Sequence, residues 1–195
     1  MQKQLDALRE VKEFLDRHSM PHFVIGGVAN AVWGRARATY DTDFKVLIGN
    51  RTIEEFVKLV GNHFELRVSH AVDFAKRTYV VPVYARNRVA VDLGLGFLPY
   101  EEQAVEKAIA VSYRGVTFAA CTPEDLIIHK AISEREKDWA DIEGVLIRQK
   151  GRLDQAYITH WLEQFANALA RPELAQRYQA LRKKTTTRRR KRKPL

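Results

Sequence analysis

Hydrophobic residues recur along the chain with two different periods, and these periods predict the order of helices and strands. Residues 2–18 carry apolar side chains at helical spacing, among them Leu8, Val11 and Leu15, and Pro21 ends this segment. Shorter runs rich in β-branched and aromatic residues predict strands. Over the first 120 residues we expect strands at 23–25, 44–48, 64–68, 78–85, 88–93, 110–113 and 116–119, with further helices at 28–33, 52–63 and 100–108.

After Cys121 the pattern becomes helical throughout. Thr122 is a good N-cap and Pro123 occupies the first helical position. The pattern therefore predicts an α/β core over residues 1–120 and a helical C-terminal part, packed on the core, over 121–184, followed by a basic, disordered tail over 185–195. The helices expected in the C-terminal part are 123–133, 136–149, 154–170 and 172–184.

The net charge of +9 is confined to the C-terminal end. Residues 182–193 contain nine basic and no acidic residues, and removing these nine from the 33 basic residues leaves 24, which equals the number of acidic residues. Such an end attracts the phosphates of nucleic acid. The alternative is a solubilising, disordered end without a specific partner.

Composition excludes several classes of protein. No apolar run approaches the roughly 20 residues that span a bilayer, so no membrane association is expected. The first residues lack the apolar core of a signal peptide, and the single cysteine, Cys121, excludes an internal disulfide. A cytoplasmic protein is therefore the expectation.

Two aspartates one residue apart are the strongest chemical signal. Asp41 and Asp43 precede the strand expected at 44–48, and residues two apart in a strand point to the same face. Two carboxylates that close repel each other unless a cation lies between them, and Mg²⁺ is bound through one or two carboxylates plus substrate phosphates. The pair predicts a metal site that holds a nucleotide. The alternative is that both residues only terminate the strand.

Two further features extend this site. Gly26 and Gly27 lie between an expected strand and a helix start, where backbone N–H groups bind phosphate. Asp92 is a lone carboxylate in an apolar strand, and if that strand lies beside Asp41 and Asp43 the three residues are enough for two divalent ions about 4 Å apart. Alternatively, Asp92 forms a structural ion pair with Arg88 or Arg86.

These residues resemble a known family. Gly-Gly followed by Arg37-x-Thr39-x-Asp41-x-Asp43 and a later strand acid is similar to the minimal nucleotidyltransferases of the DNA polymerase β superfamily. The segments 122–130 and 135–142, which carry Pro-Glu-Asp-Leu, a lysine and then Lys-Asp-x-x-Asp, resemble the AbiEii-type toxin nucleotidyltransferases. The likeness covers about residues 20–145. It implies an α/β (α+β) fold with a nucleotidyltransferase-like mixed sheet flanked by helices.

The resemblance also implies roles for single residues. Asp41 and Asp43 would bind both metal ions, while Asp92 would bind the catalytic one and help to deprotonate the attacking hydroxyl. Gly26 and Gly27 would contact the triphosphate. Arg37 and Thr39 are candidates for nucleotide binding, and the alternative for Arg37 is that it only lies in a loop. Lys130 and Lys137 are candidates for neutralising phosphate charge, and the alternative is that both are ordinary solvated charges on a helix.

The expected activity is transfer of a nucleoside monophosphate from an NTP to an acceptor hydroxyl, with two Mg²⁺ ions, or Mn²⁺ in their place. The basic end favours RNA as the acceptor, for example a tRNA 3′ end, and the resemblance adds an antitoxin protein as a partner. Transfer to a small molecule such as an aminoglycoside, transfer to a protein, and a catalytically silent nucleic-acid-binding protein are the alternatives. Acceptor choice lies in appended parts rather than the core, and this short chain has little room for them.

Overall fold

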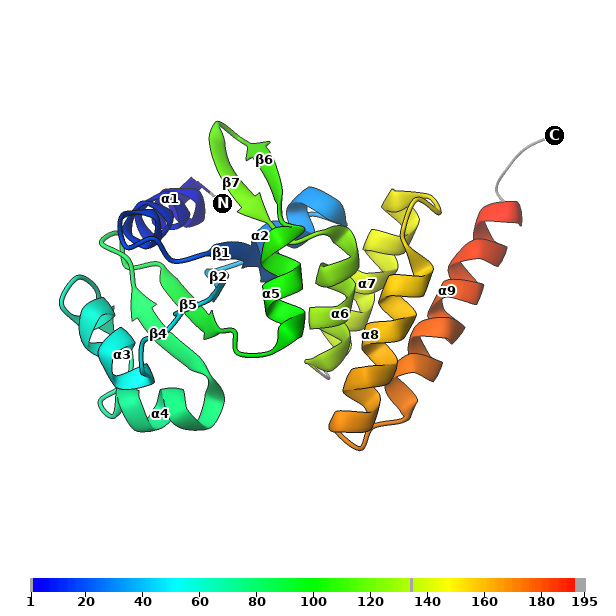
Figure 1. Cartoon of the computed structure of the whole chain (residues 1–195). Helices are drawn as coiled ribbons and strands as arrows, with labels where there is room; N and C mark the ends of the chain where they lie inside the picture. The colour runs from blue at the N-terminus through cyan, green and yellow to red at the C-terminus, as the bar shows by residue number, and fades with distance from the viewer. Residues whose placement is uncertain (1, 134, 192–195) are drawn as a thin grey trace. The chain divides into compact units, whose positions relative to one another are not determined.

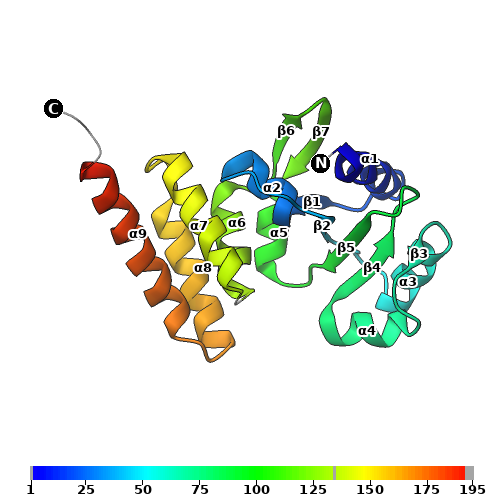
Figure 2. The ribbon, with the colours of Figure 1, turned by 180° about the vertical axis from the view of Figure 1, so that it is seen from behind.

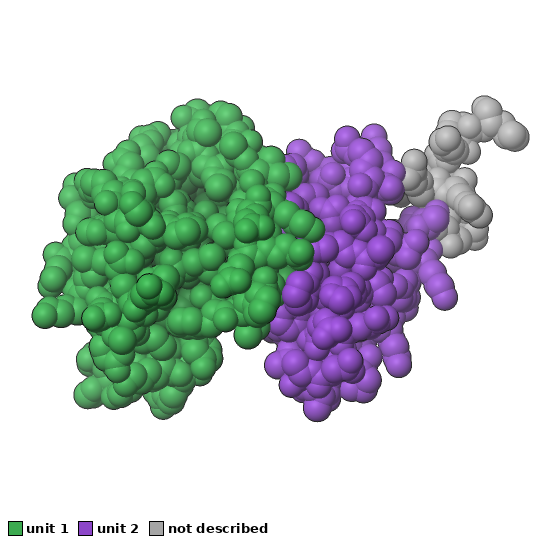
Figure 3. Space-filling view, in the orientation of Figure 1, with its two compact units in different colours: residues 1–29, 37–121 green, residues 30–36, 122–195 purple. Residues whose placement is uncertain are grey.

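The computed structural model of the chain describes residues 2–133 and 135–191, with side chains as far as residue 186 (Figure 1). It divides into two compact units, one of residues 1–29 and 37–121 and the other of residues 30–36 and 122–195 (Figure 3). Helix α2 (Gly26–Trp33) begins in the first unit and ends in the second. Whether the parts expected from the sequence at 1–120 and 121–184 fold as separate domains stays a prediction.

A seven-stranded mixed sheet forms the first unit, in the order β3-β4-β5-β2-β1-β7-β6. The pairs β2 with β5 and β1 with β7 are parallel, and the other neighbours are antiparallel. The predicted α/β class with a mixed sheet and flanking helices is confirmed. The strands are β1 (His22–Ile25), β2 (Asp41–Val46), β3 (Glu65–Leu66), β4 (Val80–Tyr84), β5 (Ala90–Leu95), β6 (Ile109–Tyr113) and β7 (Val116–Ala120).

Alternation along β2 separates a buried face of the sheet from a more open one. Thr42, Phe44 and Val46 are buried, whereas Asp41 and Asp43 are partly exposed. The Thr42 hydroxyl donates a hydrogen bond of 3.3 Å to the Gln4 carbonyl, so α1 (Gln2–Arg17) lies on the buried face. The aspartates therefore lie on the face opposite α1. The remaining helices that belong wholly to this unit are α3 (Ile53–Gly61), α4 (Ala71–Thr78) and α5 (Pro99–Glu106).

Four helices make up most of the second unit, and α6 packs against each of the other three (Figure 2). Thr122 caps α6 as predicted, since its side chain accepts a hydrogen bond from the Asp125 N–H. Helix α9 continues to Lys191, into the segment expected to be a disordered tail; residues 192–195 lie outside the described residues. The helices are α6 (Pro123–Ile132), α7 (Glu136–Gln149), α8 (Gln155–Ala168) and α9 (Glu173–Lys191).

Some elements differ from those expected. Strand β2 begins at Asp41 rather than at residue 44, and the strand expected at 64–68 shortens to β3. Helix α4 was not expected, because it is short and only Ala71 and Ala75 of its residues are buried. Across the described part of the chain, no helix is both long and apolar enough to cross a membrane.

Candidate active site

Three carboxylates share one face of the sheet. Strands β2 and β5 pair in parallel with Asp43 directly opposite Asp92, and Asp41 lies opposite Ala90. Residues opposite each other in neighbouring strands project to the same face of the sheet, and the two strands lie about 4.8 Å apart. Residues two apart in one strand also project to the same face. The expectation that the strand of Asp92 lies beside Asp41 and Asp43 is confirmed by this register.

The environment of Asp92 shows the cost of gathering these charges. Burial raises the pKa of the Asp92 carboxyl, and the negative charge of Asp41 raises it further, while the guanidinium of Arg67 opposes both effects. Arg67 Nη1 donates a hydrogen bond of 2.6 Å to Asp92 Oδ1. Asp92 is thus paired with Arg67; Arg88 and Arg86, the partners considered from the sequence, contact Glu65 and Glu10 instead.

The two glycines pack directly on the aspartate strand. Gly26 has a φ of +65°, and a Cβ added there would lie 1.8 Å from Asp43 Oδ2. A Cβ on Gly27 would lie 2.3 Å from the hydroxyl oxygen of Thr39. Any side chain at either position would displace residues of the site, so both positions require glycine and the backbone at the start of α2 reaches the carboxylates.

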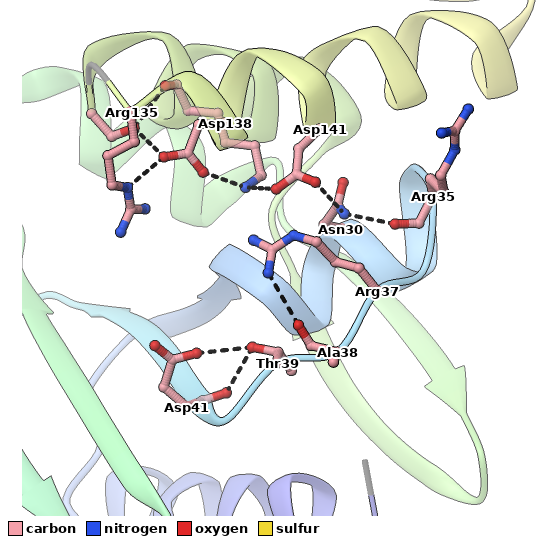
Figure 4. A network of polar contacts seen from close by, with 11 residues as sticks. Asn30, Arg35, Arg37, Ala38, Thr39, Asp41, Arg135, Asp138 and Asp141 are labelled. Carbon is pink, nitrogen blue, oxygen red and sulfur yellow. Dashed lines mark hydrogen bonds and ion pairs between the residues drawn. The ribbon is translucent and has the colours of Figure 1, made fainter.

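Thr39 links the glycines to the first aspartate. Its hydroxyl donates a hydrogen bond of 2.8 Å to Asp41 Oδ1 (Figure 4), and its side chain is almost fully buried. Arg37, two residues earlier, is exposed, and its Nη1 donates to the carbonyl of Ala38 at 3.2 Å. The structure therefore brings Gly26, Gly27, Thr39, Asp41, Asp43 and Asp92 together, and leaves Arg37 on the adjoining loop.

Lys130 lies in the second unit, between two carboxylates. Its Nζ donates hydrogen bonds to Asp138 Oδ1 at 2.9 Å and to Asp141 Oδ2 at 2.6 Å, and all three side chains are buried. These hydrogen bonds join α6 to α7. Lys137, by contrast, is exposed on α7. The catalytic roles of both lysines stay predictions.

Further polar groups complete this buried cluster (Figure 4). Asp138 Oδ2 accepts hydrogen bonds from Ser133 and Arg135, both at 2.6 Å. Asn30 Nδ2 donates to Asp141 Oδ1 at 3.1 Å and to the Arg35 carbonyl at 2.8 Å. Each carboxylate oxygen thus has a hydrogen-bond donor, which is what two buried charges require.

Arg67, the partner of Asp92, was not predicted from the sequence. The arginines expected near Asp92 lie close to it along the chain, whereas Arg67 is 25 residues away and directly follows β3. Within residues 2–133 and 135–191, no three His, Cys, Asp or Glu side chains form a ready-made metal cage. Mg²⁺ needs only one or two carboxylates when substrate phosphates supply the other ligands, so the aspartate pair fits that ion.

Two solved structures share the fold of this chain. The antibiotic-resistance factor ANT(2″)-Ia superposes with a TM-score of 0.56 at 15% identity, over 91% of this chain and 98% of that one. An antigenic nucleotidyltransferase-like protein from Paracoccidioides brasiliensis superposes with a TM-score of 0.50 at 17% identity, over 91% of this chain and 93% of that one. No curated protein sequence matches the chain.

The family itself is established by sequence. The family model described as nucleotidyl transferase of unknown function (DUF2204) matches residues 4–177, which is most of the chain. The two solved structures share the α/β fold of the chain. The chain therefore belongs to this family of nucleotidyl transferases.

Proposed function

We propose that the chain is a metal-dependent nucleotidyltransferase that moves a nucleoside monophosphate from an NTP to a hydroxyl of RNA. The observation that carries the proposal is the register of β2 and β5, which places Asp43 opposite Asp92 with Asp41 on the same face. The proposed reaction takes place in the cytoplasm, where NTPs and RNA are available.

In this reaction the acceptor oxygen bonds to the α-phosphorus, and the bond from that phosphorus to the oxygen bridging to the β-phosphate breaks, which releases pyrophosphate. Asp92 takes the proton of the attacking hydroxyl. Asp41 and Asp43 would hold two Mg²⁺ ions, with Mn²⁺ as a substitute, and Asp92 would share one of them. Bound there, the ions supply positive charge opposite the phosphates and the departing pyrophosphate.

The remaining residues position the nucleotide. The backbone at Gly26 and Gly27 approaches the triphosphate at the start of α2, where free N–H groups and the helix dipole favour anions. Thr39 fixes the orientation of Asp41 through its 2.8 Å hydrogen bond. Arg37 is exposed on the adjoining loop and would contact a phosphate of the NTP.

Two measurements test the chemistry and the acceptor class. Wild type and the double variant Asp41→Ala/Asp43→Ala are incubated with each α-labelled NTP, Mg²⁺ or Mn²⁺, and total RNA, and label in RNA is expected with wild type only. A chain truncated after residue 184 loses the arginines and lysines of residues 188–193. It is expected to bind RNA more weakly and with a flatter salt dependence.

A small-molecule acceptor is the second candidate, because the fold matches that of an antibiotic-resistance factor. For that acceptor the truncated chain keeps full activity, and label appears on an added aminoglycoside rather than on RNA. Label on the chain itself identifies a protein acceptor. The likeness to toxin nucleotidyltransferases adds an antitoxin as a proposed protein partner, which co-purification of the tagged chain from its own cells would test.

A further inference from the structure

The face that carries the three carboxylates continues across β4 towards β3. Asp92 lies opposite Pro82, and the N–H of Arg67 donates to the Pro82 carbonyl at 2.9 Å. Arg67, Pro82 and Asp92 therefore form one row across the sheet. The Arg67 side chain spans the short proline ring to reach the Asp92 carboxylate, and 29% of its surface is exposed.

The neighbouring row places an aromatic ring beside these charges. Asp41 lies opposite Ala90, and Ala90 lies opposite Tyr84. Since Ala90 has only a methyl group, no bulky side chain separates Tyr84 from Asp41 along this row. Tyr84 is partly exposed, at the end of β4.

Two guanidinium groups lie over the Tyr84 ring. The Cζ of Arg88 is 4.3 Å from the ring centroid and that of Arg67 is 5.7 Å away. Arg67 also binds Asp92, and Arg88 also pairs with Glu65. The result is an aromatic residue flanked by two arginines, each paired with a carboxylate, and joined through Arg67 to the carboxylate that receives the proton in the proposed reaction.

We propose that Tyr84, Arg67 and Arg88 bind the terminal nucleotides of a single-stranded RNA acceptor. On binding, the two guanidinium groups that lie over the Tyr84 ring move to backbone phosphates, and a base stacks on the ring in their place, so that the terminal hydroxyl lies at Asp92. Aromatic rings combined with basic groups are how proteins bind single strands with little sequence preference. This inference rests on the proposed function and names its acceptor as single-stranded RNA.

The position of this site also agrees with the direction of in-line transfer. The glycines of α2 pack on Asp43, on the β1 side of the carboxylates, whereas Arg67 and Tyr84 lie on the β3 side of Asp92. A nucleotide held by the glycines and an acceptor held by Tyr84 therefore approach the carboxylates from opposite sides. In-line displacement requires attacking and leaving oxygens on opposite sides of the phosphorus.

The test measures RNA binding separately from activity. Binding of a fluorescein-labelled 12-nucleotide RNA with a free 3′ hydroxyl is followed by anisotropy over a series of salt concentrations, with the full chain and its variants Tyr84→Leu, Tyr84→Phe and Arg67→Met. Tyr113→Leu and Arg114→Met are matched controls, because the Arg114 guanidinium lies 5.8 Å from the Tyr113 ring at the opposite edge of the sheet.

We expect Tyr84→Leu to raise the Kd for RNA about tenfold or more, since base stacking on an aromatic side chain contributes that much, and Tyr84→Phe to bind as wild type does. Arg67→Met should lower the slope of log Kd against log salt by about 0.7, the contribution of one phosphate contact in a single strand. Both control variants should match wild type, and calorimetry should give an unchanged Kd for ATP in the two Tyr84 variants and both controls.

Three results separate this inference from the proposed function. If Tyr84→Leu and Arg67→Met bind RNA with the affinity and salt slope of wild type, the site is refuted even when label transfer to RNA occurs. If wild type binds no ATP and transfers no label, but RNA affinity falls in these variants, the RNA site stands and the proposed activity fails. If wild type does not bind RNA and labels an aminoglycoside, the RNA site is refuted and the small-molecule acceptor is established.

Discussion

Replacing Lys130 with methionine separates a structural role of this residue from a catalytic one. Lys130 binds Asp138 and Asp141 at 2.9 and 2.6 Å, and the side chains of the three residues are between 0% and 6% exposed. Methionine fills a similar volume but leaves two buried carboxylates without the cation between them. Removal of one partner from a buried ion pair costs about 3–5 kcal/mol. For a chain of this length that corresponds to a fall in the thermal midpoint of about 6–20 °C.

The assay combines stability with activity. Thermal unfolding followed by far-UV circular dichroism gives the midpoint, and label transfer is then measured at a temperature at which wild type and variant are both folded. The triple variant Lys130→Met/Asp138→Asn/Asp141→Asn removes the buried charges as well, so most of the lost stability should return. Lys137→Met, which alters an exposed residue of the same motif, should change the stability by less than about 0.5 kcal/mol.

One result would refute this reasoning. If Lys130→Met melts within about 2 °C of wild type and still loses label transfer, the lysine is not needed to neutralise Asp138 and Asp141 and acts on the substrate instead. The opposite result, a large loss of stability with normal transfer by the folded variant, assigns Lys130 to the interior of the second unit.

Three further predictions concern the glycines and Asp138. Gly26→Ala combines a left-handed φ of +65° with a Cβ that would lie 1.8 Å from Asp43 Oδ2, so the carboxylate must move by more than about 1 Å. The kcat for transfer should therefore fall about 100-fold, and a loss of less than fivefold would contradict this. Gly27→Ala places a Cβ 2.3 Å from the Thr39 hydroxyl and should destabilise the chain by about 1–3 kcal/mol, and an unchanged urea midpoint would show that Thr39 yields freely. Burial alone raises the pKa of Asp138, but hydrogen bonds from Ser133, Lys130 and Arg135 outweigh burial and lower it. The stability that Asp138 contributes is therefore present above its ordinary pKa of 3.8 and is lost as the pH falls below that value. Between about pH 5 and pH 2, the urea midpoint of Asp138→Asn should therefore depend less on pH than that of wild type.

The sequence predicted the parts of the site that depend on local periodicity. Asp41 and Asp43 share a face because a strand has a period of two, and the Thr122 cap of α6 follows from residue preferences at helix starts. The neighbouring position of Asp92 was a conditional expectation, because strand order is a long-range property that no local pattern determines. The match of the family to residues 4–177 agrees with the resemblance drawn from these motifs.

The contacts of Arg67 and Lys130 could not be predicted in the same way. Arg67 reaches Asp92 only because β3 and β5 are separated by a single strand and the residue between them is a proline. Lys130 could be recognised from the sequence as a charged helix residue, but its burial depends on how α6 and α7 pack, which places Asp138 and Asp141 around it. Helix α4 was missed because it is only eight residues long and no side-chain cap marks its start.

Pro82 has a consequence for how the chain can associate with other proteins. Its carbonyl accepts the hydrogen bond of Arg67, so the position where its N–H would be also faces β3, and the second hydrogen bond of this pair is missing from the ladder. On the other side of Pro82 along the edge, Glu65 lies opposite Tyr84 and pairs with Arg88, so this edge also carries charged side chains. Short, charged, proline-containing edges are how sheet proteins avoid joining to other strands. A peptide that binds by adding a strand would find no continuous row of backbone donors at this edge.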